Sequence, residues 1–225
     1  MKIINNYFFL SYLYNLYTKL KINFMSTEQE KFSHHAKNWS KDPEMISMTK
    51  SFEKGIRERI KINKDLILLD LGCGPGLLGM SFINELKKVI FLDFSEGMIN
   101  EVKNSLEEKN IKNYELKLGE IESYNDEKVD LVTISMVLHH IKDIGKTIKK
   151  ISTILNKGGK MIITDLDKAE IFGKEEFQIH HHGFNRDELS NIIKNNGFNN
   201  VKVESFDTIT WKGTKANRFI LIAEI

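Results

Sequence analysis

The strongest constraint on the fold is an apolar run that leads into closely spaced glycines. Residues 66–69 are apolar without interruption, as expected of a strand that is buried on both faces. Glycines follow at positions 72, 74 and 76, and a helical pattern of apolar residues begins at Leu78. Glycine adopts backbone angles that other residues avoid, and it lets backbone N–H groups approach a ligand closely. The segment therefore predicts a strand, a tight turn able to hold a nucleotide, and a helix.

The same alternation of apolar runs and helical patterns continues along the chain. Strands that alternate with helices in this way form a parallel sheet in an α/β domain. Glycines at 158 and 197 stand where the helices before them should end. The further apolar runs lie at 89–92, 129–134 and 161–163, and the helical patterns lie at 78–86, 98–106 and 144–155.

Two other regions indicate how the sheet ends. Residues 114–118 alternate between apolar and polar side chains, which is typical of a strand at or near a sheet edge. Strand candidates at 201–206 and 219–222 have no helix between them. A parallel crossover needs a dozen or more residues and usually a helix, so these two strands should be antiparallel.

Length and charge limit the classes of protein that remain. At 225 residues, the chain is long enough for one substantial core and short for two domains. Its 33 basic and 31 acidic residues are scattered, so no basic stripe suits a nucleic-acid backbone. The single cysteine, Cys73, cannot form a disulfide within the chain, which fits a reducing compartment. We therefore expect a cytoplasmic protein with no nucleic-acid partner and no integral membrane association, while its oligomeric state stays open.

The first 24 residues differ from the rest. Apolar and aromatic residues dominate 7–17, and no acidic residue precedes Glu28. The apolar stretch is too short to span a bilayer and lacks a small-residue cleavage site. Residues 25–28, Met-Ser-Thr-Glu, read like an ordinary protein start. Residues 1–24 are therefore interpreted as an extension (an upstream in-frame start, an organellar presequence or an extra helix), and residues 25–225 as the domain.

The glycines also satisfy a second nucleotide-binding pattern. Gly74, Gly76 and Gly79 form G-x-G-x-x-G, and Asp93 follows 19 residues after Gly74, as in dinucleotide-binding domains. In either pattern, Asp93 is placed to accept hydrogen bonds from two ribose hydroxyls. Asp70 separates the patterns by charge, because a carboxylate attracts an ammonium or a sulfonium and not the pyrophosphate of NAD. The charge argument favours S-adenosylmethionine over NAD.

Five segments, taken in order, resemble one family. They read LDLGCGPG at 69–76, LDFSEGM at 92–98, GEI at 119–121, VLHHI at 137–141 and LNKGGK at 155–160. From about Phe32 to Ile225, the chain resembles the class I S-adenosylmethionine-dependent methyltransferases, in particular the small-molecule group that includes the ubiquinone and menaquinone biosynthesis enzymes. The resemblance implies a Rossmann-like three-layer α/β sandwich with an N-terminal helical segment. Its seven-stranded, mostly parallel sheet would have the order 3-2-1-4-5-7-6, with strand 7 antiparallel.

The resemblance also implies methyl transfer to a small-molecule acceptor and a role for individual residues at the cofactor. Glu120 stands where the family usually has Asp, so its reach to the adenine amino group is an open point. The implied contacts are Asp70, Gly72, Gly74 and Gly76 at the methionine part, Asp93 at the ribose, Met98, Glu120 and Ile121 at the adenine, and Ser135 with Met136 beside the transferred methyl.

Histidines supply the candidate catalytic residues, although methyl transfer needs a general base only when the nucleophile is an unactivated hydroxyl or a similar acid. His139 and His140 follow the fourth strand at the active-site end of the sheet, and either could contact the substrate or merely cap the turn. His181 lies after the fifth strand, in a segment around 165–184 where this fold often carries substrate-covering insertions. Asp165, at the end of that strand, is interpreted as a solvated terminus in preference to a base. Adjacent histidines alone do not make a metal site, so none is expected.

Two alternatives remain beside an S-adenosylmethionine-dependent methyltransferase. This fold also supports non-catalytic binding, so the chain could be an S-adenosylmethionine-binding scaffold. An NAD-dependent oxidoreductase of the short-chain type would need a Tyr-x-x-x-Lys pair after the fifth strand. Tyr124 and Lys128 have that spacing but precede the fourth strand. In the N-terminal segment, Trp39 is either a lid residue over the cofactor or a satellite core aromatic.

Overall fold

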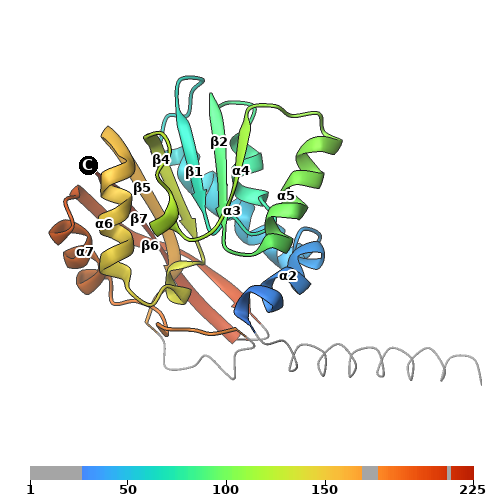
Figure 1. The fold of residues 1–225 in the computed structure, drawn as a ribbon. Coiled ribbons are helices and arrows are strands. Elements are labelled where there is room, and N and C mark those ends of the chain that lie inside the picture. The colour runs from blue at the N-terminus through green and yellow to red at the C-terminus, as the bar shows by residue number, and fades with distance from the viewer. Residues whose placement is uncertain (1–26, 169–176, 212–213) are drawn as a thin grey trace, which may run out of the picture.

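Seven strands form one sheet in the order β3-β2-β1-β4-β5-β7-β6 (Figure 1). β1 to β5 are parallel, while β7 pairs antiparallel with β5 and with β6. The predicted strand order and the antiparallel last strand are confirmed. The strands are β1 (Ile67–Leu71), β2 (Lys88–Asp93), β3 (Tyr114–Leu118), β4 (Val129–Ser135), β5 (Leu155–Leu166), β6 (Asn199–Trp211) and β7 (Thr214–Glu224).

This computed structural model describes residues 27–168, 177–211 and 214–225. The expectations for residues 1–24 fall outside these ranges, as does the middle of the 165–184 segment. Within the described ranges, no helix combines the length and the apolar character that crossing a lipid bilayer requires.

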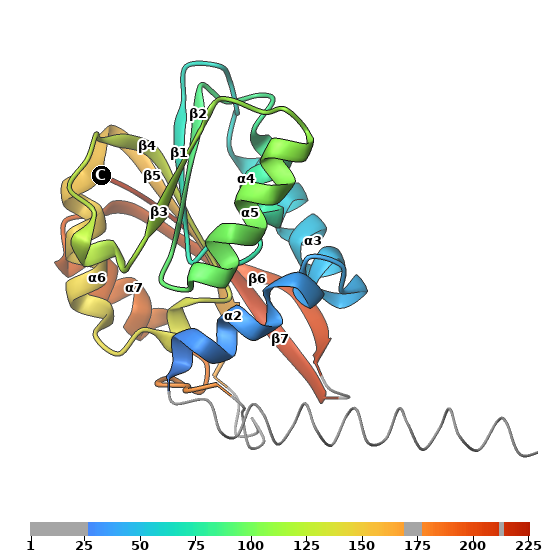
Figure 2. The ribbon, with the colours of Figure 1, turned by 45° about the vertical axis from the view of Figure 1, so that its right-hand side comes forward.

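Helices cover both faces of the sheet and make three layers (Figures 1 and 2). Apolar side chains of α3, α4 and α5 pack on one face, and those of α6 and α7 pack on the other. Figure 2 shows α2 lying at the end of the sheet beside the start of α5. The helices are α2 (Glu28–Trp39), α3 (Pro43–Arg59), α4 (Leu77–Phe82), α5 (Glu96–Glu108), α6 (Ile144–Ile154) and α7 (Arg186–Asn195), with the short 3-10 turns η1 (Ile121–Ser123) and η2 (Leu138–His140).

Strand burial follows the sequence pattern. Every residue of β1 is buried, whereas β3 at the sheet edge is half-buried and ends with Leu118, which is 54% exposed. The prediction from Gly158 was wrong, because α6 already ends at Ile154 and Gly158 lies within β5. Leu155 is buried and extended and pairs with Val129, so β5 begins several residues before the apolar run that revealed it.

Candidate functional site

The turn between β1 and α4 presents backbone atoms to a cavity. Gly72 and Gly74 adopt φ values of +63° and +52°, which only glycine adopts without strain. The N–H groups of Gly72 and Cys73 both donate to the carbonyl of Leu92 on β2, at 2.8 and 3.1 Å, and so fix the turn. A Cβ added at Gly72 would lie 2.5 Å from Val137, whereas one added at Gly74 would meet nothing within 4 Å. Gly72 therefore permits close packing, and Gly74 borders open space.

Two buried carboxylates hold this turn from behind. Asp70, at 2% exposure, accepts hydrogen bonds from the N–H of Gly79 at 3.0 Å and from the hydroxyl of Thr133 at 2.8 Å. Asp93, at 6% exposure, accepts from the N–H groups of Gly74 and Ser95, each at 2.9 Å. Asp93 thereby links the end of β2 to the glycine turn and to the start of α5.

Burial changes the protonation of both carboxyls. Burial raises the pKa of Asp70 to about 6, although the hydrogen bonds from Thr133 and Gly79 act in the opposite direction. Burial likewise raises the pKa of Asp93. Taking a carboxylate out of water costs free energy, and a nearby cation offsets that cost. The two groups together favour a positively charged ligand.

Two adjoining cavities form a cleft over the carboxyl ends of β1, β2 and β4. The first, which we call the apolar cavity, has a volume of about 210 Å³, and the second, the charged cavity, about 400 Å³. The apolar cavity borders the glycine turn and extends between α2, α3 and β6. The charged cavity is lined by Glu28, Glu120, Glu122, Lys142, Asp143 and Lys146, among others. Both share the residues Phe32, Gly72, Asp93, Phe94, Val137 and His140.

Most of the predicted site residues meet at this cleft. Gly76 and His181 line neither cavity. The N–H of Gly76 closes the turn on Cys73, and the Nε2 atom of His181 donates to the carbonyl of Ile141 at 2.9 Å. Asp70, Gly72, Gly74, Asp93, Met98, Ser135, His139 and His140 line the apolar cavity, while Glu120 and Ile121 line the charged cavity with Gly72, Asp93 and His140.

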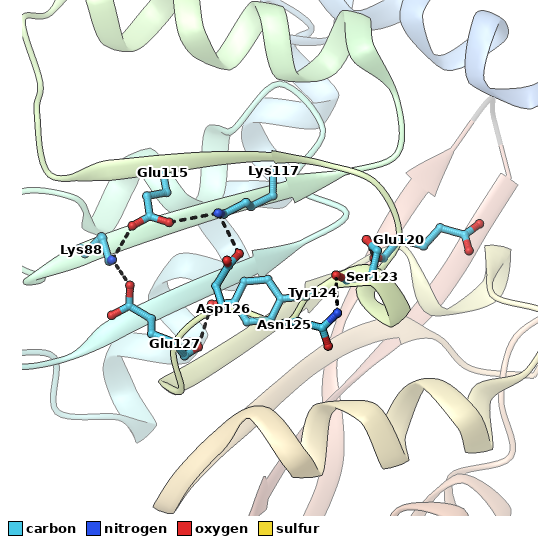
Figure 3. A network of polar contacts seen from close by, with 9 residues as sticks. All are labelled: Lys88, Glu115, Lys117, Glu120, Ser123, Tyr124, Asn125, Asp126 and Glu127. Carbon is cyan, nitrogen blue, oxygen red and sulfur yellow. Dashed lines mark hydrogen bonds and ion pairs between the residues drawn. The ribbon is translucent and has the colours of Figure 1, made fainter.

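The loop that carries Glu120 is anchored by an ionic network (Figure 3). Lys117 pairs with Asp126 at 2.7 Å, and Lys88 pairs with Glu127 and, at 2.6 Å, with Glu115. The buried Tyr124 donates to the carbonyl of Glu127 at 2.8 Å. Figure 3 shows the Glu120 carboxylate pointing away from this network, so that side chain is not used in anchoring the loop.

The two histidines after β4 have different partners. His139 is buried, and its Nδ1 lies 2.8 Å from Oδ1 of Asp165. The Nδ1 of His140 donates to the carbonyl of Gln178 at 2.7 Å. Burial, as the larger cause, and the neighbouring His139, as the smaller one, lower the pKa of His140 to about 4. This ring is therefore neutral at physiological pH. Asp165 has 0% exposure, and its interpretation as a solvated terminus was wrong, because β7 and η2 cover the end of β5.

An aromatic cluster closes the cleft where the two cavities meet. The ring of Phe32 on α2 lies 4.3 Å from that of Phe177 and 5.3 Å from that of Phe94, measured between centroids. Trp39 contacts Phe32 and Phe177 and also lines the apolar cavity. The Ser33 hydroxyl accepts from the N–H of Gly97 at 3.1 Å and so fixes α2 against the start of α5. Trp39 therefore borders the cleft, and its role as a lid residue stays a prediction.

The sequence reasoning missed several residues of the site. The apolar run 129–134 contains two polar residues, Asp130 and Thr133. The polar side chain of Thr133 within this run was the signal for a buried hydrogen bond. Phe177 and Ile209 line the apolar cavity but carry no local signal, since tertiary packing alone brings them there. Within the described ranges, no cluster of three His, Cys, Asp or Glu side chains could hold a metal ion.

Comparison with known proteins identifies the family. A family model described as a methyltransferase domain matches residues 62–218, which include the glycine turn, Asp70 and Asp93. The chain belongs to the class I S-adenosylmethionine-dependent methyltransferases. The residues at the cleft that favour a cation are therefore found in a family whose cofactor is the sulfonium S-adenosylmethionine.

Individual relatives match this chain only in part. An uncharacterized methyltransferase of Schizosaccharomyces pombe is 28% identical over 60% of this chain and 54% of its own length. A ubiquinone biosynthesis O-methyltransferase of Coxiella burnetii is 28% identical over 65% of this chain and 64% of its own. Phosphoethanolamine N-methyltransferase 2 of Haemonchus contortus, solved with S-adenosyl-L-methionine, has a TM-score of 0.65 and 18% identity over 77% of this chain and 52% of that one. The chain thus spans about half to two thirds of the length of these relatives. The similarity to the Haemonchus contortus structure, at 18% identity, shows a shared fold only.

Proposed function

We propose that this protein transfers the methyl group of S-adenosylmethionine to a small molecule with an apolar body. The observation that carries the proposal is the junction of the two cavities at Gly72, Asp93 and Val137. The junction itself offers a buried carboxylate and glycine backbone, and the apolar cavity continues from it to a wall of apolar side chains. A cofactor and an acceptor could therefore meet there.

The cofactor assignment rests on charge and on space. Asp93 keeps free lone pairs beside its two backbone donors, and these could accept from ribose hydroxyls. Asp70 and Asp93 are the ionisable carboxylates of the apolar cavity, and among the described residues no lysine or arginine lines it. A sulfonium fits this charge, whereas a pyrophosphate placed beside the glycine turn would find no lysine or arginine of the apolar cavity to pair with. The NAD-dependent alternative is therefore not retained.

The acceptor assignment rests on the far side of the apolar cavity. Methionines, aromatic rings and aliphatic side chains dominate there, contributed by α2, α3, β5, β6 and the segment at 177–179. Such a wall binds an apolar body by burial, at roughly 25 cal/mol per Å² of apolar surface. Its members are Trp39, Met45, Met48, Leu166, Phe177 and Ile209.

Methyl transfer itself can be tested before the acceptor is identified. The protein is incubated with S-adenosylmethionine that carries a ¹³C-labelled methyl group and with a metabolite extract, and the products are analysed by mass spectrometry. We expect one labelled small molecule and an equal amount of S-adenosylhomocysteine. Tight cofactor binding with no labelled product in any extract would instead support the non-catalytic scaffold.

A further inference from the structure

A buried carboxylate, Asp165, lies behind the cleft and lines neither of its two cavities. Asp165 on β5 is fully buried, and its Oδ1 accepts hydrogen bonds from Nδ1 of His139 and from the N–H of Leu166, both at 2.8 Å. Its Oδ2 lies 3.3 Å from the backbone N–H of the same histidine. Within the described residues, His139 is the only ion-pair partner of Asp165. The carboxylate thus fixes both the ring and the main chain of His139.

This contact defines the tautomer of His139. An ionised carboxylate only accepts hydrogen bonds, so Nδ1 carries the ring proton and Nε2 is the basic nitrogen. A proton taken up at Nε2 would produce an imidazolium directly beside the buried charge of Asp165. Pairing of this kind stabilises the protonated ring and holds its orientation. The arrangement is suited to accepting a proton.

The surroundings of His139 make it the best-placed base. It lines the apolar cavity together with Ser135, the last residue of β4, and Met136, which follows it. Among the residues that the structure describes, four histidine and aspartate neighbours lie close to it: Asp165, the adjacent His140 with ring centroids 4.1 Å apart, and His180 and His181, whose backbone N–H groups bond the His139 carbonyl. Asp70, Cys73 and Asp93 line the same cavity. Burial raises the pKa of the Cys73 thiol, while His140 is held neutral and donates its ring proton elsewhere.

We propose that His139 is the catalytic base of an O-methylation and that Asp165 is its positioning residue. The proposal rests on the proposed function and narrows its acceptor to a hydroxyl compound with an apolar body. The hydroxyl proton passes to Nε2 of His139 while an oxygen lone pair attacks the methyl carbon. The carbon–sulfur bond breaks, and its electron pair stays on sulfur. A methyl ether, S-adenosylhomocysteine and an imidazolium result, and the proton then leaves to water.

A hydroxyl acceptor follows from what the base is needed for. A neutral amine attacks a methyl group without first losing a proton, and a thiol ionises readily near neutral pH. An unactivated hydroxyl is a poor nucleophile until a base removes its proton, and a positioned base typically contributes 10²- to 10⁴-fold to the rate. A buried His–Asp pair beside the cleft therefore points to oxygen as the methylated atom.

The test uses the ¹³C-methyl product and two phenols as defined probes. The ¹³C chemical shift of the labelled methyl distinguishes an oxygen, nitrogen or sulfur attachment. Rates with phenol and with 4-nitrophenol, which ionises without help near neutral pH, are compared for the wild type, His139→Asn and Asp165→Asn. His182→Asn is the matched control, because His182 lines neither cavity. S-adenosylhomocysteine binding verifies that each variant is folded.

We expect the labelled methyl group to be attached to oxygen. In His139→Asn, the methylation rate should fall at least 100-fold with phenol and less than tenfold with 4-nitrophenol. In His182→Asn, both rates should be unchanged. Asp165→Asn should also lose rate, with ¹⁵N spectra showing a changed His139 tautomer. If neither phenol reacts, the same variants are compared on the extract product. An N- or S-methyl product, or equal loss on both phenols, overturns the base while leaving methyl transfer intact. No labelled product at all counts against the proposed function itself.

Discussion

Two glycines of the same turn serve different purposes. At Gly72 the added Cβ would overlap Val137, so a side chain there disturbs packing. At Gly74 the added Cβ would meet nothing within 4 Å, and this residue borders the apolar cavity. Gly72 is required by the packing of the turn, whereas Gly74 leaves open space beside the apolar cavity.

Gly74→Ala should therefore affect binding more than stability. Its φ of +52° costs an L-residue about 1–2 kcal/mol, so unfolding by urea should show a loss of that size. The methyl group would project into ligand space, and we expect S-adenosylhomocysteine affinity to fall at least tenfold in calorimetry. Gly145→Ala on α6 is the matched control and should leave affinity unchanged. Equal affinity in both variants would show that the turn does not contact the ligand.

Asp70 should make cofactor binding depend on pH. Its pKa of about 6 means that the free protein protonates this carboxyl below pH 6, and a cationic ligand must then displace the proton. Affinity for S-adenosylmethionine should fall as pH decreases from 7 to 5, by up to about tenfold per unit. S-adenosylhomocysteine, which lacks the sulfonium charge, should show a shallower fall. An identical pH profile in Asp70→Asn would refute the assignment.

At the scale of elements, a buried ionic cluster ties α3 to the last two strands. Arg218 on β7 is 1% exposed and donates to both oxygens of Asp207 on β6, at 2.7 and 2.5 Å. Asp207 also accepts from the hydroxyl of Ser51 on α3 at 2.5 Å. The cluster thus fastens to β6 and β7 the helix that contributes Met45 and Met48 to the apolar cavity.

Arg218→Leu should destabilise the protein strongly. The substitution leaves the partly buried Asp207 carboxylate without its cation. Loss of one partner of a buried ion pair lowers the free energy of unfolding by about 3 kcal/mol. The double variant with Asp207→Asn should recover part of that loss, because no unpaired charge remains. Arg57→Leu is the control, since its pair with Glu85 is solvent-exposed and contributes under about 1 kcal/mol. Equal losses at Arg218 and Arg57 in urea unfolding would contradict this reasoning.

At the scale of the whole molecule, the sequence predicted what local patterns encode. Together with the family resemblance, the apolar runs, the glycine turn and the helix-free final pair were sufficient to predict the strand order and most of the residues that line the cleft near the glycine turn. The helix end predicted from Gly158 was wrong, because a glycine with positive φ can end a helix or lie at a bend in a strand. Of the apolar wall, Trp39 and the segment at 177–179 belong to regions that the sequence analysis had singled out. Met45, Met48 and Ile209 were not predictable, since α3 and β6 are distant in sequence and meet only through packing.

The central claim is that the cleft beside Asp93 binds S-adenosylmethionine, and one titration tests it most directly. S-adenosylhomocysteine is titrated calorimetrically into the wild type and into Asp93→Ala. We predict one-to-one binding to the wild type and an affinity at least tenfold lower in the variant, because charge-assisted hydrogen bonds contribute about 1.5–3 kcal/mol each. An unchanged dissociation constant in a folded Asp93→Ala protein, or no binding to the wild type, would contradict the account.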